Sequence, residues 1–355
     1  MRIELGLTSF ADNSDIYTDE GRSDAITAGE RIRNIIEEIE VADRNGLDVY
    51  GLGEHHRPDY AVSDPVSVLS AAARTTNNIK LSSAVTVLSS DDPVRVYQRF
   101  STLNAISNGR AEIIVGRGSF IESFPLFGYN LNDYDELFNE KIDLLTHINH
   151  NEVVNWKGHF RPSIEGLGVY PRSEFGPIPI SIATGGTPES SLKAGALGLP
   201  ITYAIIGGDP KRFKGHVDVY KANAEAYGHD VDKLPIGVHS WGYIAETDEQ
   251  ARREFFPSVK ASHDVLARER GWPPYSENSF ERELGPNGAL YVGSPETVAQ
   301  KIIDTVETLG ITRFMLHTPV GSMPHEKTIN TIELLAKRVK PIVDKYFEDK
   351  EKESM

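Results

Sequence analysis

The sequence predicts one barrel of alternating parallel β-strands and α-helices, a (β/α)8 or TIM barrel. Short apolar runs alternate with amphipathic segments from one end of the 355 residues to the other, which is typical of βαβ units. Eight such pairs can be traced, the number that closes a barrel. A barrel of this type needs about 250 residues, so the chain leaves room for insertions. We expect one domain over residues 1–347 and a charged, disordered tail at 348–355.

The expected strands are short apolar runs, and the expected helices are amphipathic. The strands cover Ile3–Ser9, Leu47–Gly53, Ile79–Leu88, Ala111–Gly116, Ile178–Thr184, Ile201–Ile206, Ile236–Ala245 and Arg313–His317. The helices cover Glu30–Asn45, Pro65–Thr76, Val94–Ile106, Asp135–Asn149, Glu189–Leu197, Pro210–Tyr227, Asp248–Glu269, Pro295–Leu309 and Glu326–Lys345.

Capping residues support these boundaries. A side chain that can cap a helix precedes proline at Asp64-Pro65, Asp92-Pro93, Asp209-Pro210 and Ser294-Pro295. Glycine, which tolerates a left-handed C-cap, follows helical patterns at Gly46, Gly109, Gly198, Gly228 and Gly310.

Two connections are longer than a barrel needs. Ser119–Asn132 follows the fourth strand, and Gly271–Leu290 precedes the last βα unit. Long connections in compact domains are often functional. The first is rich in aromatic residues, so we expect it to act as a lid.

The composition narrows the classes of function. The formal net charge of −15 disfavours nucleic acid and anionic membranes as partners, because a field of that sign repels phosphate at long range. Local groups would therefore have to hold any phosphate ligand. The absence of cysteine excludes disulfides, thiolate nucleophiles and cysteine-bound metals. With no signal-peptide pattern and no run of roughly 20 apolar residues, we expect a cytoplasmic protein.

Barrel enzymes place catalytic groups where strands end, and the second strand ends in Glu54, His55 and His56. Side chains alternate along a strand, so Glu54 and His56 should point one way and His55 the other. His55 is therefore the candidate to face a ligand, with a pair of hydrogen-bonded loop histidines as the alternative. We expect no metal, because neighbouring strand residues diverge and no HExxH or cysteine cluster completes a site.

The fourth and fifth strands end in residues suited to an anion. Arg117 lies between Gly116 and Gly118, where glycine admits a ligand close to the backbone and arginine offers a fork of donors to phosphate. After the fifth strand, Thr184–Ser191 leads into a helix whose free N–H groups and dipole favour an anion. A structural ion pair and a plain turn into a helix are the alternatives.

Three other strands carry candidates. The third has small residues around Ala84, which would let a flat ring lie against the backbone, with ordinary barrel core as the alternative. The eighth strand ends in His317, for which packing is the alternative to ligand contact. The expected walls of a substrate pocket are Phe120, Phe124, Phe127, His239 and Trp241.

Taken in order, these motifs resemble the bacterial luciferase-like family of flavin-dependent oxidoreductases over nearly the whole chain. Each motif is weak alone, whereas the ordered set is specific. The motifs are Gly53-Glu54-His55-His56, Asp64-Pro65, Asp92-Pro93-Val94-Arg95, Ser107-Asn108-Gly109-Arg110, Gly116-Arg117-Gly118, Gly185-Gly186-Thr187-Pro188-Glu189-Ser190, Gly195-Ala196-Leu197-Gly198-Leu199-Pro200 and Gly293-Ser294-Pro295-Glu296.

The resemblance implies a barrel that binds reduced FMN, or in some branches the deazaflavin F420, and usually uses molecular oxygen. His55 matches the histidine associated with the oxygenated flavin, and Ala84–Val85 matches a non-proline cis peptide beneath the flavin ring. Arg117 and the loop Gly185–Ser190 match the phosphate region. The expected cofactor-binding residues are Ala84, Val85, Thr86, Arg117, Gly118, Thr184, Gly185, Gly186, Thr187 and Ser190.

Two positions depart from the family pattern. Gly116 stands where luciferase has a reactive cysteine, and Tyr134-Asp135 stand where the family places a second phosphate arginine. We therefore do not assume light emission. The phosphate grip should depend more heavily on Arg117 and the helix start.

The leading hypothesis is a two-component monooxygenase. A separate reductase supplies FMNH2, oxygen adds to flavin C4a, and the hydroperoxide attacks a small, mainly apolar organic substrate, with His55 as the catalytic residue. The alternatives are an F420-dependent oxidoreductase, a non-catalytic flavin-binding protein, and a metal or Schiff-base enzyme, for which no strand ends in the necessary lysine. The resemblance also implies a homodimer, with Pro65–Thr76 and Val94–Ile106 as candidate contacts.

Overall fold

The structure is a computed structural model that describes residues 2–13, 26–118, 120–321 and 323–353. It confirms the predicted barrel of eight parallel strands, closed where the last strand pairs with the first. The barrel strands in spatial order are β1 (Glu4–Ser9), β2 (Val49–Leu52), β3 (Lys80–Ser83), β5 (Ala111–Gly116), β8 (Ile180–Thr184), β9 (Ile201–Ala204), β10 (Ile236–Ile244) and β12 (Arg313–His317).

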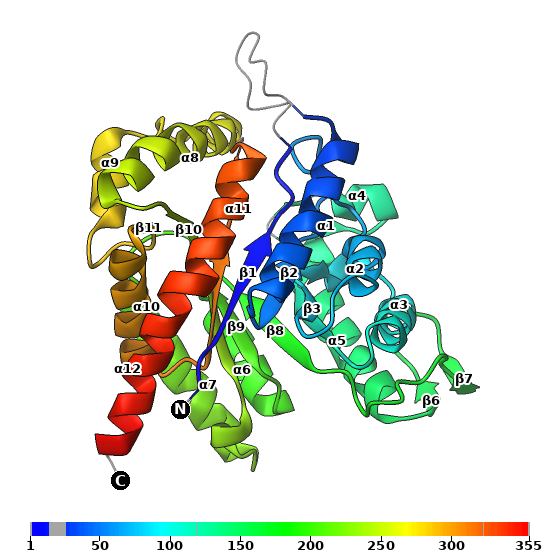
Figure 1. Cartoon of the computed structure of the whole chain (residues 1–355). Helices are drawn as coiled ribbons and strands as arrows, with labels where there is room; N and C mark the ends of the chain where they lie inside the picture. Colours follow the sequence, from blue (N-terminus) through cyan, green and yellow to red (C-terminus); the bar gives the residue numbers. More distant parts are fainter. Residues whose placement is uncertain (1, 14–25, 119, 322, 354–355) are drawn as a thin grey trace.

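The helices surround this barrel, as Figure 1 shows. They are α1 (Ala28–Arg44), α2 (Pro65–Ala73), α3 (Pro93–Ile106), α5 (Tyr134–His150), α6 (Pro188–Leu197), α7 (Lys214–Ala226), α8 (Asp248–Arg270), α10 (Pro295–Leu309), α11 (His325–Leu334) and α12 (Lys340–Glu353). The predicted helix at 210–227 begins as a 3-10 turn at Pro210–Phe213, and a π-helical turn at Leu335–Val339 joins α11 to α12.

Helix capping follows the predicted pattern at three of the four proline starts. The side chains of Asp92, Asp209 and Ser294 accept backbone N–H groups of the first turn. Asp64 makes no such bond and instead accepts the hydroxyl of Ser67.

The predicted third strand is divided in two. β3 ends at Ser83, and β4 (Thr86–Val87) continues the run with pairing to β5. Between them the peptide bond from Ala84 to Val85 is cis, which confirms the geometry implied by the family resemblance.

Several elements were not expected from the sequence. A hairpin of β6 (Val153–Trp156) and β7 (Ile164–Gly168) projects at the edge of the molecule (Figure 1). The two long connections contain α4 (Ser123–Phe127) and α9 (Glu277–Leu284), and β11 (Tyr291–Gly293) adds to the sheet beside β10.

The prediction of a disordered tail from residue 348 is wrong for the residues that the structure describes, because α12 continues to Glu353. Phe347 is buried beneath this end of the helix. Lys350 and Tyr346 both donate to Glu307 on α10, so the tail is held by contacts that its charged composition does not reveal. Among the described helices, none has the length and apolar character needed to cross a membrane.

A cluster of charges closes the barrel at the starts of its strands. Arg313 donates to Glu4 at 2.7 Å and to Glu112 at 2.6 Å, and Lys80 donates to Glu4 at 2.5 Å. Burial, the largest single effect, raises the pKa of Glu112, but the charge and hydrogen bond of Arg313 together with the charge of Lys80 outweigh it, and the pKa lies below its usual value. The balance is the same for Glu4.

We predict that Arg313→Met lowers the free energy of unfolding at pH 7 by about 3 kcal/mol, because it leaves the buried Glu112 with only the partly exposed Lys80 as a counter-charge. Carboxylates with a folded pKa below the unfolded value of 4.5 stabilise the fold above that pH, and this contribution is lost as the pH falls through the folded pKa. Urea unfolding should therefore show a smaller loss at pH 3. An equal loss at both pH values would contradict the ion pair, and Arg313→Met with Glu112→Gln should recover part of the stability.

Candidate active site

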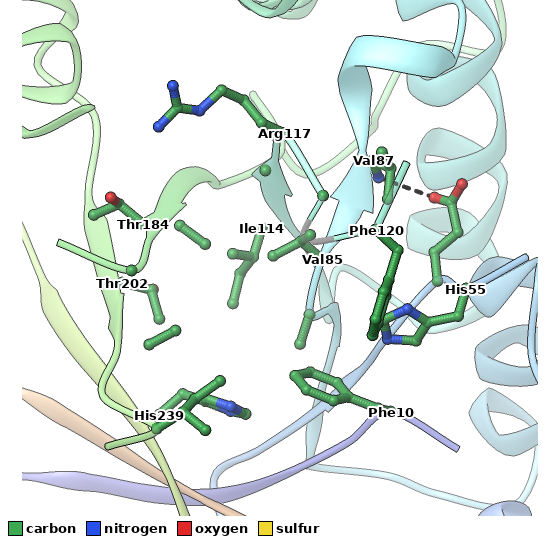
Figure 2. Close-up of a pocket in the computed structure, with 18 of the residues that line it drawn as sticks. Phe10, His55, Val85, Val87, Ile114, Arg117, Phe120, Thr184, Thr202 and His239 are labelled. Carbon is green, nitrogen blue, oxygen red and sulfur yellow. Dashed lines mark hydrogen bonds between the residues drawn. The ribbon is translucent and has the colours of Figure 1, made fainter. Parts of the chain in front are cut away.

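A cavity of about 510 Å³ lies at the end of the barrel where the strands terminate. β1, β5, β8, β9, β10 and β12 contribute to its lining, together with the segments that follow β2 and β3 (Figure 2). The predicted site residues that line it are His55, Ala84, Val85, Arg117, Gly118, Phe120, Thr184, Gly185, Thr187 and His239.

Phe124, Phe127 and Trp241 were predicted as pocket walls, but the structure places them outside this lining. Phe124 is fully buried and stacks on Tyr134, whereas Phe127 is half exposed and meets the ring of His56 edge-on. Trp241 is the last residue of β10 that pairs with β12, opposite His317, and its side chain packs against a separate apolar cluster.

Three predicted cofactor-binding residues also lie outside the lining. Thr86 is buried in β4, and Gly186 faces the ring of Phe213. Ser190 contributes indirectly, because its hydroxyl accepts from Arg117 at 3.1 Å.

Glu54 and His56 form a pair that does not include His55, although all three residues lie beyond the end of β2 and line the cavity. His56 Nε2 lies 2.9 Å from Glu54 Oε1, and Glu54 Oε2 accepts the N–H of Val87 at 3.0 Å (Figure 2). Both carboxylate oxygens of Glu54 are therefore bonded, one to His56 and the other to β4. The imidazole of His55 is left free of this pair and can contact a ligand.

The ring of His55 is buried among aromatic rings. It stacks on Tyr60 with centroids 4.1 Å apart, and it meets Phe10 at 5.1 Å and Phe120 at 5.4 Å edge-on. Burial, with smaller contributions from the charges of His56 and Arg57, lowers its pKa to about 3. Its Nε2 is buried and has no hydrogen-bond partner in the part of the chain that the structure describes. His55 is therefore a neutral imidazole near pH 7 with one nitrogen open to a ligand.

Glycines make room for the cis peptide. A Cβ on Gly51 would lie 2.8 Å from Cβ of Ala84, and a Cβ on Gly116 would lie 2.8 Å from a methyl group of Val85. Both distances are shorter than van der Waals contact, so larger side chains would displace the peptide.

Arg117 is directed toward the start of α6. Its guanidinium donates to the hydroxyls of Thr187 and Ser190, both at 3.1 Å, and pairs with Asp135. The ring of Tyr134 lies 5.5 Å from the guanidinium carbon. One cation and two hydroxyls thus converge at a helix N-terminus, an arrangement that suits an anion.

The Gly185–Ser190 loop has fewer free backbone N–H groups for an anion than the sequence predicted. The hydroxyl of Thr184 accepts the N–H groups of Gly186 and Thr187 at 3.2 and 3.1 Å, so these two amides are already bonded. A Cβ on Gly185 would meet no atom within 4 Å, which leaves open space above the loop.

Sequence reasoning predicted the first strand but missed its contribution to the site, together with most of the apolar lining. Thr8 and Phe10 lie where β1 ends, a position that could have been inspected like the other strand ends. The other lining residues that were not predicted include Ile114, Thr202, Ala204, Phe213 and Met315.

Arg57 joins three segments at the cavity mouth. It donates to Asp59 beside it, to Glu122 at the start of α4 and to Glu269 at the end of α8. Its guanidinium carbon also lies 4.6 Å from the ring centre of Phe120. These contacts hold the aromatic segment after β5 over the site, which is the position expected of a lid.

Comparison with known proteins shows a match to one enzyme family. Residues 5–313 match the family model described as luciferase-like monooxygenase. An N-acetyl-S-alkylcysteine monooxygenase from Bacillus subtilis is 24% identical, with 83% of this chain and 89% of the relative covered. Limonene 1,2-monooxygenase from Rhodococcus erythropolis is 25% identical, with 87% and 81% covered.

Solved structures share the fold. Monooxygenase RslO1 from Streptomyces bottropensis superimposes with a TM-score of 0.83 at 22% identity, covering 96% of this chain and 99% of that one. The oxygenating constituent of 3,6-diketocamphane monooxygenase from Pseudomonas putida, in complex with FMN, gives 0.74 at 20% identity, with 96% and 99% covered. An F420-dependent secondary alcohol dehydrogenase gives 0.73 at 16% identity, with 97% and 99% covered.

We predict that His55→Gln flattens the acid side of the stability profile. A histidine with a folded pKa of about 3 and an unfolded value of 6.5 stabilises the fold above pH 6.5, and this contribution declines as the pH falls. The substitution should remove up to about 1.4 kcal/mol per pH unit from the slope between pH 6 and 4. Urea unfolding over that range measures it, with His150→Gln on the exposed end of α5 as the control. Equal slopes for His55→Gln and the unchanged protein would contradict a buried neutral ring.

Proposed function

This chain belongs to the luciferase-like monooxygenase family, and from that premise we propose that it is an FMN-dependent monooxygenase. In this proposal a separate reductase supplies reduced FMN, and the enzyme uses molecular oxygen to oxidise a small, mainly apolar organic substrate. The observation that carries the proposal is one cavity with an anion anchor at Arg117 and a buried neutral imidazole at His55.

The residues present fit a flavin. Arg117, Thr187 and Ser190 would hold the phosphate, because three side-chain donors converge there without any net positive charge on the chain. The space bordered by Ala84, Val85 and Gly118 would take the ring, since small residues and glycines keep it open.

The bound reduced flavin would supply electrons for the activation of oxygen. His55 would hold or pass a proton at Nε2, the nitrogen that has no partner among the described residues. Phe10, Tyr60 and Phe120 would exclude water around that nitrogen, because their rings pack against the imidazole.

An apolar substrate is supported by the apolar side chains in the lining of the cavity. Phe10, Phe120, Ile206 and Phe213 belong to its lining. The name of one relative, limonene 1,2-monooxygenase, points in the same direction.

The competing cofactor is F420, because two proteins of this fold are named as dependent on it. Several relatives are named as monooxygenases, which favours FMN and oxygen here. A homodimer formed through α2 and α3 remains part of the proposal.

We predict that Arg117→Met weakens FMN binding by about 10- to 100-fold, the effect of losing a charge-assisted hydrogen bond to phosphate. Riboflavin has no phosphate, so its affinity should change less than about threefold. Asp135→Asn is the matched control: it removes the acidic partner of Arg117 and should leave FMN binding equal or slightly tighter. Flavin fluorescence titration measures the affinity of Arg117→Met for FMN and for riboflavin, and the affinity of Asp135→Asn for FMN. An equal loss for FMN and riboflavin would place the phosphate elsewhere.

We also predict that rapid mixing of the complex with reduced FMN and oxygen gives a transient absorbance distinct from both reduced and oxidised flavin. His55→Ala should shorten its lifetime by about tenfold or more, since it removes the proton-holding group, whereas His150→Ala should not. Direct return to oxidised flavin in the unchanged protein would count against a monooxygenase. Tight binding of F420 with no binding of FMN would establish the competing cofactor.

A further inference from the structure

A row of buried polar side chains lies behind the cavity, on the side of β1, β10 and β12. Oγ1 of Thr8 lies 2.6 Å from Nδ1 of His239 and 3.2 Å from Nδ1 of His317. Nε2 of His317 lies 4.0 Å from Oδ2 of Asp12. None of the four is more than 5% exposed, and His239 and Thr8 line the cavity.

The barrel pairing places these groups together. Thr8 and His317 are register partners on β1 and β12, and β10 places His239 on the other side of β12. The ring of Phe10 packs on His239 at 5.4 Å and on His317 at 4.2 Å, which keeps both imidazoles in place.

The hydrogen bonds along this row can run in either of two directions, depending on which atom of each pair carries the hydrogen. A threonine hydroxyl donates one hydrogen and can accept another, so between two Nδ1 atoms it donates to one and accepts from the other. A neutral imidazole carries its hydrogen on one nitrogen only. The tautomers of His239 and His317 are therefore coupled through Thr8.

Asp12 decides between the two directions. When its carboxyl is ionised, His317 carries its hydrogen on Nε2 toward Asp12, Thr8 donates to Nδ1 of His317, and His239 donates from Nδ1 to Thr8. Nε2 of His239 is then an acceptor. When Asp12 is protonated every bond reverses, and Nε2 of His239 becomes an N–H donor.

We propose that Asp12, His317, Thr8 and His239 form a proton relay in which protonation of Asp12 switches Nε2 of His239 from acceptor to donor. At the proposed flavin site, which this inference presupposes only for its use in catalysis, His239 is a second acid–base group beside His55. Its acceptor form takes a hydrogen from a ligand N–H or O–H, and its donor form binds a carbonyl oxygen.

The unpaired atoms at both ends agree with this assignment. Nε2 of His239 and Oδ2 of Asp12 are buried, and neither has a hydrogen-bond partner among the residues that the structure describes. The other oxygen of Asp12 accepts the N–H of Gly321 at 3.0 Å, which leaves Oδ2 to carry the proton.

The charges around the row place the switch near neutral pH. Burial raises the pKa of Asp12 to about 7, against the N–H of Gly321 and the charge of Arg31, while Asp59 adds to the rise. Burial lowers the pKa of His239 to about 4, and it lowers the pKa of His317 further with the help of His239, His55 and Arg31. Arg31 is paired with Glu38, and Tyr60 also faces Asp12. Both rings therefore stay neutral while Asp12 titrates.

The proton balance closes within the row. A ligand proton is taken up at Nε2 of His239, and the hydrogen on Nδ1 passes to Thr8. The Thr8 hydrogen passes to Nδ1 of His317, whose Nε2 hydrogen passes to Oδ2 of Asp12. The last gap of 4.0 Å must shorten by about 1 Å for this transfer. No oxidant or further reactant is needed.

The test is ¹⁵N NMR of the flavin-free protein with labelled histidine, in which the shifts of Nδ1 and Nε2 report each tautomer. The signals of His239 among the 11 histidines are assigned with His239→Gln. From pH 9 to pH 5 the hydrogen of His239 should move from Nδ1 to Nε2, with a midpoint near pH 7. Asp12→Asn and Thr8→Val should each abolish that change. Thr8→Ser keeps the hydroxyl and should retain it.

Glu283→Gln is the control, because Glu283 is another carboxyl whose pKa burial raises, and it lies on α9 outside the row. It should leave the midpoint unchanged. A tautomer of His239 that stays constant from pH 5 to 9, or one that switches equally in Thr8→Val, would overturn the relay. Because no flavin is present, this result is independent of whether FMN is the cofactor.

Discussion

The hydrogen bonding between β1 and β12 is the constraint on which the rest of the structure depends. It closes the sheet and brings residues 309 positions apart into register, Glu4 beside Arg313 and Thr8 beside His317. At one end of this pair of strands lies the charge cluster at the starts of the strands. At the other end lies the floor of the cavity. An open sheet would expose both sets of polar groups to water, and neither would keep its shifted pKa values.

Burial gives the cavity its chemistry. His55, His239 and His317 would each titrate near pH 6.5 in water, but the low-dielectric interior disfavours their charged forms. The same desolvation raises the pKa of Asp12. The aromatic ring of Phe10 contacts all three imidazoles, so one side chain both excludes water and fixes their orientation. Neutral nitrogens without partners are costly in an apolar interior, and such groups are typical of sites that meet a ligand.

An acidic chain can still hold an anion when the attraction is local. Arg117 is supported by two hydroxyls and a helix N-terminus, whereas the net charge of −15 acts only at long range. Asp135 pairs with the same guanidinium and would compete with a phosphate for it. Under the proposed function, this competition would favour release of the flavin, which suits a cofactor that a separate reductase supplies.

The sequence by itself determined the barrel, because eight alternations of apolar strand and amphipathic helix have few other ways to bury their apolar faces. It also located His55 and Arg117, because both follow the end of a predicted strand. The Ala84–Val85 peptide was located by the resemblance to the family. The tertiary structure decided what each group contacts. Strand periodicity could not show that Trp241 lies outside the lining of the cavity. It also could not show that the hydroxyl of Thr184 accepts the amide hydrogens of its own loop. The row formed by Asp12, Thr8, His239 and His317 was equally invisible to it. These contacts form between side chains from strands that are distant in the sequence but share one buried space. A sequence pattern does not show which distant residues come together.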